Sequence, residues 1–406
     1  MNPSVSSVTP SVETRYDPAS RAAVQSCSRA TWKMRDPWSS ASLFTVHHGS
    51  GRHRVGAGDM GRRGSGLVGA LMLALGLTWV PAPAGAADDQ SRAEAPATST
   101  YELEVVSHNI AGAMLFHGDG AAVDRVVLQV QKSNPDVVAL QEVCATQASA
   151  LRSRLRGWRV VFTPMTKNHP GCPSLFGGPG QLGEVLASRW PMRDITVTQL
   201  GDTYHHISDK TNHITCADIV VKGFASDALR ACSTHLRSER GNSRIRTEQT
   251  AVIQELFRQR ISDGAQAVVV AGDFNAGAAR REMDNLYELD RRGELSGLGQ
   301  FVEGDQSDTR FFGNALDEDG RPVACSATWC RSGEFTHASK ADLTSFQHKL
   351  DYIFYSDNAA DASDVRASCA ASTSDHCIYR SAAIVTMRTA TGGGGLLGGI
   401  IPGLPL

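Results

Sequence analysis

The feature that most constrains the fold is the alternation of short β-rich runs with helical patterns between residues 101 and 388. Strands interleaved with helices predict an α/β fold. Two long stretches, 163–184 and 296–348, carry neither pattern, and we expect them to be irregular rims of an active site. The predicted strands are Tyr101–Ser107, Asp136–Gln141, Val185–Ser188, Ile195–Leu200, Ile214–Val221, Leu229–Thr234, Ala267–Ala271, Lys349–Tyr355 and Ala382–Met387. The predicted helices are Ala121–Lys132, Ala145–Arg156 and Ser243–Arg260.

Residues 60–86 have the three parts of a secretory signal peptide. Arg62 and Arg63 precede the apolar run Leu67–Val80, and small residues follow it up to Ala86. This run of 14 residues is too short to span a bilayer, which needs about 20, so a multi-pass membrane protein is excluded. We predict cleavage after Ala86 and a secreted protein. A buried core helix is the alternative, and the arginine pair also allows a twin-arginine export route.

The flanking segments define the expected domain organisation. Residues 1–59 are rich in Ser, Pro and Arg without a sustained period, which gives no reason to fold. They are either a disordered extension or an over-extended reading of a gene that starts at Met60. We expect a linker over 87–100, one folded domain over 101–388, and a flexible Gly-rich tail over 389–406, with a surface anchor as the alternative for the tail.

The predicted mature part holds eight cysteines, and Cys27 lies in the extension. An even number of cysteines in an exported chain predicts disulfides. Cys216 and Cys232 are equidistant from a turn near Phe224, so they could face each other across two strands. Other connectivities stay open. Short loops favour Cys325–Cys330 and Cys369–Cys377, and elimination leaves Cys144–Cys172.

Polar residues cluster where the predicted strands begin or end. Four carboxylates, two histidines and two asparagines occupy such positions: Asn109, Glu142, His235, Asp273, Asn275, Asp351, Asp375 and His376. Burying several carboxylates together costs several kcal/mol for each uncompensated ion, so a cation or a partner for each is required. Oxygen ligands suit Mg²⁺, Mn²⁺ or Ca²⁺ rather than zinc.

Six short motifs carry these residues in one order along the chain. They are Ser107-His-Asn109, Leu140-Gln-Glu-Val143, Ser233-Thr-His-Leu236, Ala271-Gly-Asp-Phe-Asn275, Lys349-Leu-Asp-Tyr-Ile-Phe354 and Ser374-Asp-His376. In this order they resemble the endonuclease/exonuclease/phosphatase superfamily, which includes pancreatic-type deoxyribonuclease, abasic-site endonucleases, neutral sphingomyelinases and inositol-polyphosphate phosphatases. The resemblance implies a four-layer α/β sandwich, with two packed mixed or antiparallel sheets flanked by helices, and a metal-dependent phosphoric ester hydrolase.

The resemblance also implies a metal centre. Glu142 would be the main carboxylate ligand, helped by Asn109 and Asp375. Because Mg²⁺ keeps several waters and takes few protein ligands, this set suffices. Mg²⁺ is the expected cofactor, with Mn²⁺ or Ca²⁺ as alternatives.

The remaining residues match the part of the family that handles the phosphate. Asp351 would orient His376, which activates water or contacts the phosphate. Asp273 would orient the nucleophile or protonate the leaving oxygen, and Asn275 would donate a hydrogen bond to the phosphate. His235 matches the second histidine of the deoxyribonuclease-like branch, a candidate general acid. Fixed donors of this kind stabilise charge that is spread over a phosphate.

The favoured substrate is nucleic acid, cleaved by an endonuclease, although the sequence leaves other phosphate esters open. A set of arginines could grip a phosphate backbone, with a solvated helix face as the equal alternative: Arg230, Arg237, Arg240, Arg244 and Arg246. Residues 87–406 hold 31 basic and 38 acidic residues, which does not favour tight binding to nucleic acid. A sphingomyelinase-like phospholipid phosphodiesterase, another phosphomonoesterase and a catalytically silent binding protein are the alternatives. We expect a monomer without a stable protein partner.

Overall fold

The structure is a computed structural model that describes residues 96–174, 177–201, 211–238, 241–264, 266–288, 297–339 and 342–390. The predicted signal peptide, the segment 1–59, most of the predicted tail, Cys27 and Arg240 lie outside these ranges. Among the described residues, none of the helices has the length and apolar character that crossing a membrane requires.

Two six-stranded sheets form the centre of the fold. The first sheet has the strand order β13-β14-β1-β2-β4-β3, and the second has the order β5-β6-β7-β8-β12-β9. Both sheets are mixed, because β1 pairs with β2 and β7 pairs with β8 in parallel whereas the other pairs are antiparallel. The strands of the first sheet are β1 Thr98–Asn109, β2 Val137–Cys144, β3 Arg159–Pro173, β4 Pro179–Ser188, β13 Val365–Ala370 and β14 Ile378–Arg388. Those of the second are β5 Met192–Gln199, β6 His213–Ile219, β7 Leu229–His235, β8 Ala267–Asp273, β9 Phe301–Glu303 and β12 Asp351–Ser356. A separate hairpin pairs β10 His337–Ser339 with β11 Asp342–His348.

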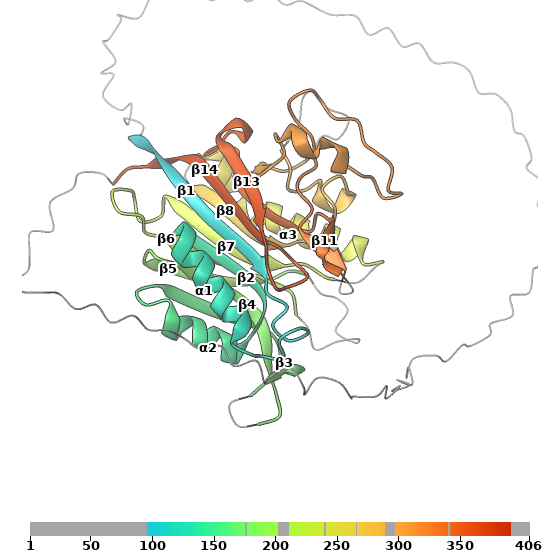
Figure 1. The fold of residues 1–406 in the computed structure, drawn as a ribbon. Coiled ribbons are helices and arrows are strands. Elements are labelled where there is room, and N and C mark those ends of the chain that lie inside the picture. The colour runs from blue at the N-terminus through green and yellow to red at the C-terminus, as the bar shows by residue number, and fades with distance from the viewer. Residues whose placement is uncertain are drawn as a thin grey trace, which may run out of the picture. The chain divides into compact units, whose positions relative to one another are not determined.

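Helices cover the outer face of each sheet (Figure 1). The helices α1 (Ala121–Ser133) and α2 (Ala145–Arg154) share a buried apolar cluster with β1, β2 and β4. The helix α3 (Ser243–Ser262) packs Ile253 and Phe257 against β8 and β12. Between the two sheets, a third cluster joins residues such as Leu103 of β1 to Val269 of β8. The order helices, sheet, sheet, helix confirms the predicted four-layer α/β sandwich.

Each predicted helix and strand is present, but the expectation that 163–184 is irregular is wrong. This stretch contains most of β3 and β4, which form a long antiparallel hairpin. Three of its prolines, Pro164, Pro170 and Pro173, lie in the edge strand β3, where a missing N–H breaks no ladder on the open side, and Pro179 is the first residue of β4. Gly183 is required by close packing, since a Cβ there would lie 2.1 Å from the carbonyl oxygen of Thr163. In the described residues 297–339 and 342–348, the structure is irregular except for β9, the hairpin β10–β11 and a 3-10 turn at Thr309–Asn314.

The cysteines pair as the sequence favoured. Cys216 and Cys232 are register partners in β6 and β7 and form a disulfide across the two strands. The other disulfides are Cys144–Cys172, Cys325–Cys330 and Cys369–Cys377. Four disulfides indicate a protein that matures in an oxidising, extracellular setting.

Candidate active site

Three neighbouring strands of the second sheet place three predicted residues side by side at the same edge of the sheet. His235 ends β7 and is the register partner of Asp273, which ends the parallel strand β8. Asp351 begins the antiparallel strand β12 and is the register partner of Asp273 on the other side. Parallel strands end at the same edge of a sheet, and an antiparallel neighbour begins there. The backbone pairing therefore places Asp273 between His235 and Asp351.

The first sheet contributes residues from its own strand ends. Asn109 is the last residue of β1, and Asp375 and His376 precede β14, the antiparallel neighbour of β1. The Ser374 hydroxyl joins these two segments: it donates to the carbonyl oxygen of Asn109 at 2.7 Å and accepts from the backbone N–H of His376 at 3.2 Å.

Asp273 lies at the centre of the cluster and is 1% exposed. Asn109 Nδ2 donates to its Oδ2 at 3.0 Å, and the backbone N–H of Asn275 donates to its Oδ1 at 2.9 Å. The same Oδ2 lies 3.5 Å from His235 Nε2 and 3.7 Å from His376 Nε2. Two buried imidazoles thus flank one carboxylate, each on a different segment of the chain.

Two carboxylates favour the imidazolium form of His376. Its Nδ1 donates to Asp351 Oδ2 at 2.7 Å, and Asp351 is fully buried. Burial by itself lowers the pKa of His376, but the charges of Asp351 and Asp273 and the hydrogen bond to Asp351 outweigh it and raise the pKa to about 10. The ring is therefore a fixed cationic donor whose Nε2 faces Asp273.

Asp273 changes protonation state close to neutral pH. Burial raises the pKa of this carboxyl group to about 7, with a further upward contribution from Asp351 and a downward one from His376. A carboxyl group with a pKa near the working pH is suited to general acid–base catalysis. The pair Asp273 and His376 can therefore hold and move a proton within the cluster.

Two of the predicted residues have a left-handed backbone, with φ 55° at Glu142 and φ 52° at Asn275. Asparagine tolerates this conformation, but glutamate adopts it rarely. Glu142 lies at a bulge of β2, where pairing with β4 shifts between Leu140 and Val143. Bulges of this kind redirect a side chain, and strained residues concentrate at functional sites.

Two residues of the site have no clear sequence signal. Thr336 is fully buried, and its Oγ1 accepts from the backbone N–H groups of Leu350 at 3.0 Å and Asp351 at 2.9 Å. His337 packs its ring against that of His376, with centroids 4.6 Å apart. Both lie in the stretch expected to be an irregular rim, where no periodicity marks them.

A model of the Endonuclease/Exonuclease/phosphatase family matches residues 106–376, a span that contains every residue of the cluster. The chain belongs to this family. Members of the endonuclease/exonuclease/phosphatase family hydrolyse phosphoester bonds, so the protein is a phosphoric ester hydrolase. Among curated proteins, none matches this chain.

Several solved structures are similar in fold. An endonuclease/exonuclease/phosphatase from Beutenbergia cavernae is 17% identical, with coverage of 71% of this chain and 72% of that one and a TM-score of 0.46. The human Nocturnin catalytic domain with bound sulfate anion is 17% identical, with coverage of 72% and 98% and a TM-score of 0.46. Truncated Caenorhabditis elegans TDP2 is 16% identical, with coverage of 71% and 98% and a TM-score of 0.45.

The family depends on divalent metal ions, and the residues of this chain fit such an ion. Glu142 is half-buried, and within the described ranges its carboxylate has no hydrogen-bond or ion-pair partner. Asn109 and Asp375 add further oxygen donors, the kind that Mg²⁺ prefers. In the described chain, two groups of three potential ligands have donor atoms within 4.8 Å of one another: Asp273, Asp351 and His376, and His337, Asp375 and His376. Glu142 belongs to neither group.

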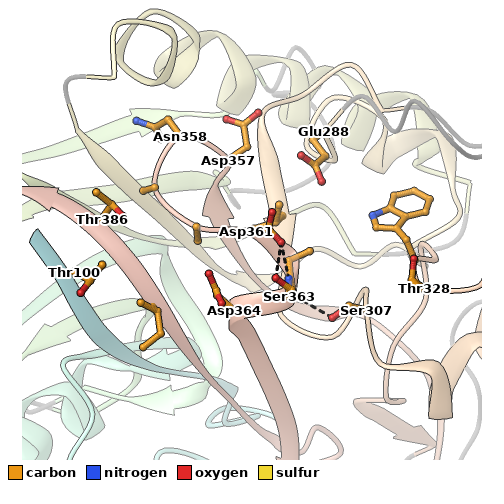
Figure 2. Close-up of a pocket in the computed structure, with 16 residues that line it drawn as sticks. Thr100, Glu288, Ser307, Thr328, Asp357, Asn358, Asp361, Ser363, Asp364 and Thr386 are labelled. Atoms are coloured by element: carbon orange, nitrogen blue, oxygen red, sulfur yellow. Dashed lines mark hydrogen bonds between the residues drawn. The ribbon is translucent and has the colours of Figure 1, made fainter. Parts of the chain in front are cut away.

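Two cavities of similar volume differ in their relation to the cluster. One, of about 700 Å³, is lined by Asn275, His337 and Lys349. The other, of about 710 Å³, contains none of the predicted site residues and is lined by acidic side chains (Figure 2): Glu288, Asp357, Asp361 and Asp364. The first cavity also contains Glu282, Asp317 and Glu318, but it adds the cations Arg246, Arg280 and Lys349. Carboxylates repel a phosphate, so the first cavity suits the substrate of a family phosphoesterase better than the second, which has no Lys or Arg among the described residues of its lining.

The expectation that a set of arginines grips a phosphate backbone is wrong for two of its members. Arg230 forms a buried ion pair with Asp218 at 2.6 Å, and Arg246 forms one with Glu282 at 3.0 Å. Buried guanidinium groups that already have a carboxylate partner cannot bind a ligand without losing it. Arg244 is exposed and lies near Glu248 of the same helix.

Proposed function

We propose that this family member is a secreted, divalent-metal-dependent phosphodiesterase that hydrolyses nucleic acids, most directly as an endonuclease. One observation carries the proposal: His235 Nε2 and His376 Nε2 both approach Oδ2 of the buried carboxylate of Asp273, at 3.5 and 3.7 Å. A phosphodiester needs a group that takes a proton from water and another that supplies one to the leaving oxygen. Two imidazoles around one carboxylate meet both needs.

In the proposed mechanism each residue has a separate task. Asp273 orients the attacking water and accepts its proton as the new phosphorus–oxygen bond forms. His376, held by Asp351, donates a hydrogen bond to a phosphate oxygen. His235 supplies the proton that the leaving oxygen takes when its bond to phosphorus breaks. Asn275 uses one amide hydrogen on the carbonyl oxygen of Leu236, at 3.1 Å, and its second amide hydrogen can bind the phosphate.

The divalent ion, Mg²⁺ in this proposal, would be held by Glu142, Asn109 and Asp375. When bound, it offsets the negative charge that develops on a phosphoryl oxygen. Mn²⁺ and Ca²⁺ share the preference for oxygen ligands, so metal replacement distinguishes among the three.

Plasmid nicking tests the proposal. With Mg²⁺, the purified protein should convert supercoiled DNA to open circles, and excess chelator should stop the reaction. Asp273→Ala and His376→Ala should abolish nicking while the circular dichroism spectrum stays unchanged. Asp364→Asn is the matched control, because this exposed carboxylate lines the other cavity. A fully active Asp273→Ala protein would overturn the role given to this residue.

The same preparation separates the nuclease from the phospholipid alternative. Release of phosphocholine from sphingomyelin, without nicking, would replace a nucleic-acid substrate by a lipid one. Export is tested separately by sequencing the N-terminus of the protein recovered outside the cell, which should begin at Ala87.

A further inference from the structure

A short antiparallel pairing places His337 beside His376. The backbone N–H of Ala338 donates to the carbonyl oxygen of Asp375 at 2.8 Å, and that of Cys377 donates to the carbonyl oxygen of Thr336 at 2.8 Å. Residues 337 and 376 are bridge partners within this pairing. Directly opposed side chains on paired strands lie close together, so the backbone itself fixes the contact between the two imidazoles.

The donor atoms of three side chains converge at this pairing. His337, Asp375 and His376 each offer one ligand atom, and these atoms lie within 4.8 Å of one another. His376 Nδ1 is engaged by Asp351 at 2.7 Å, so a metal ion would bind through Nε2 and displace the proton that this nitrogen carries in the imidazolium. Metal-binding histidines commonly donate their other nitrogen to a carboxylate in this way, because the hydrogen bond fixes the tautomer and the ring orientation.

His337 provides an independent indication of a ligand. Its Nδ1 is a buried atom that has no hydrogen-bond partner in the described part of the chain. Buried polar atoms are nearly always satisfied, so an unsatisfied one calls for a bound group or for water.

We propose that His337, Asp375 and His376 form a binding site for a divalent transition-metal ion, with Zn²⁺ as the best fit, and that this ion inhibits the enzyme. Two imidazoles and one carboxylate, with a water as the fourth ligand, are a zinc ligand set. Mg²⁺ prefers oxygen ligands and octahedral geometry, so it competes poorly for this site.

Inhibition follows from shared residues and rests on the proposed function. Zinc on His376 Nε2 withdraws this nitrogen from Asp273 and from the substrate phosphate. Zinc on Asp375 removes a donor from the proposed magnesium centre. The ion therefore blocks two tasks at once without a conformational change.

Calorimetric titration of Zn²⁺ into the full chain, in excess Mg²⁺, tests the site. The wild type should bind Zn²⁺ at one site that His337→Phe weakens at least tenfold, since phenylalanine keeps the ring packing but lacks the nitrogen. His348→Phe is the matched control, because His348 stacks on His337 with centroids 6.0 Å apart yet belongs to neither donor group. It should bind Zn²⁺ as the wild type does. Equal affinity in wild type and His337→Phe, or no zinc binding at all, would overturn the proposal.

Two further measurements keep the test decisive. If His337→Phe fails to fold, His337→Asn is titrated instead, with folding checked by circular dichroism. In plasmid nicking, the Zn²⁺ concentration that halves the rate should rise at least tenfold in the same variant. Zinc binding that depends on His337 in a protein inactive on every phosphoester would leave the site standing and reject the proposed function. If the protein is active and its zinc affinity is unaffected by His337→Phe, the proposed function stands and the zinc site is rejected.

Discussion

Replacing Thr336 by valine tests how the Asp351–His376 pair is held. Valine keeps the shape of threonine but removes the Oγ1 that accepts from the backbone N–H groups of Leu350 and Asp351, at 3.0 and 2.9 Å. Thr336 is fully buried, so water cannot replace the lost acceptor. Each buried donor left without a partner costs about 1–3 kcal/mol. We expect the free energy of unfolding to fall by roughly 2–6 kcal/mol, since two donors are affected.

Thr336→Ser is the control for this substitution. Serine keeps the hydroxyl oxygen and loses one methyl group, which costs about 1 kcal/mol when buried. Urea denaturation of the three proteins gives the difference, and hydrolysis measured under native conditions shows whether Asp351 has shifted. We expect Thr336→Val to lose activity in excess of its lost stability, because the first residue of β12 is no longer anchored. Equal unfolding free energies for the valine and serine variants would refute the reasoning.

Three further outcomes follow from buried groups and cross-links. In the presence of chelator, the free energy of unfolding should fall by up to roughly 4 kcal/mol as pH rises from 7 to 10. The reason is the raised pKa of His376: its stabilising contribution is complete below the pKa of the unfolded chain and is lost as pH passes about 10. The fall should be smaller in His376→Gln, and an identical pH dependence would contradict the raised pKa of His376. Asp218→Ala should cost about 3–5 kcal/mol in urea, since Arg230 is left as a buried charge, whereas Glu255→Ala, which breaks an exposed pair, should leave the curve unchanged. Replacing Cys216 and Cys232 together by alanine should cost about 3 kcal/mol, given a separation of 16 residues; an unchanged unfolding midpoint would argue against the cross-link.

Long apolar periods made most of the fold predictable. Ala267–Ala271 and Ser243–Arg260 are found as β8 and α3 because each buries one continuous apolar run or face. The hairpin of β3 and β4 was missed because its prolines and glycines are typical of loops. The prolines of β3 fit because β3 is an edge strand whose pairing with β4 has several register shifts, and Pro179 fits as the first residue of β4. These are properties of the sheet rather than of the segment.

The residues of the candidate site also fall into those that the sequence predicted and those that it did not. Residues at strand ends, such as Asp273 and Asp351, could be inferred from their motifs, and the structure brings them together. Thr336 and His337 act through partners far along the chain, and an isolated Thr-His pair in an irregular stretch has no distinguishing pattern. The prediction for the arginines was wrong for another reason: the hairpin register that pairs Cys216 with Cys232 also pairs Asp218 with Arg230, but the sequence does not show that this ion pair is buried.

The pairing of β7, β8 and β12 also makes the catalytic residues independent of the segments that would contact the substrate. His235, Asp273 and Asp351 keep their spacing through hydrogen bonds between neighbouring strands, whatever the connecting segments contain. The exposed parts of the long connection between β8 and β12 can therefore be lengthened, shortened or exchanged, provided that Asn275, β9, Thr336 and His337 keep their places. Natural divergence or design could in this way give one hydrolytic centre many different substrate rims.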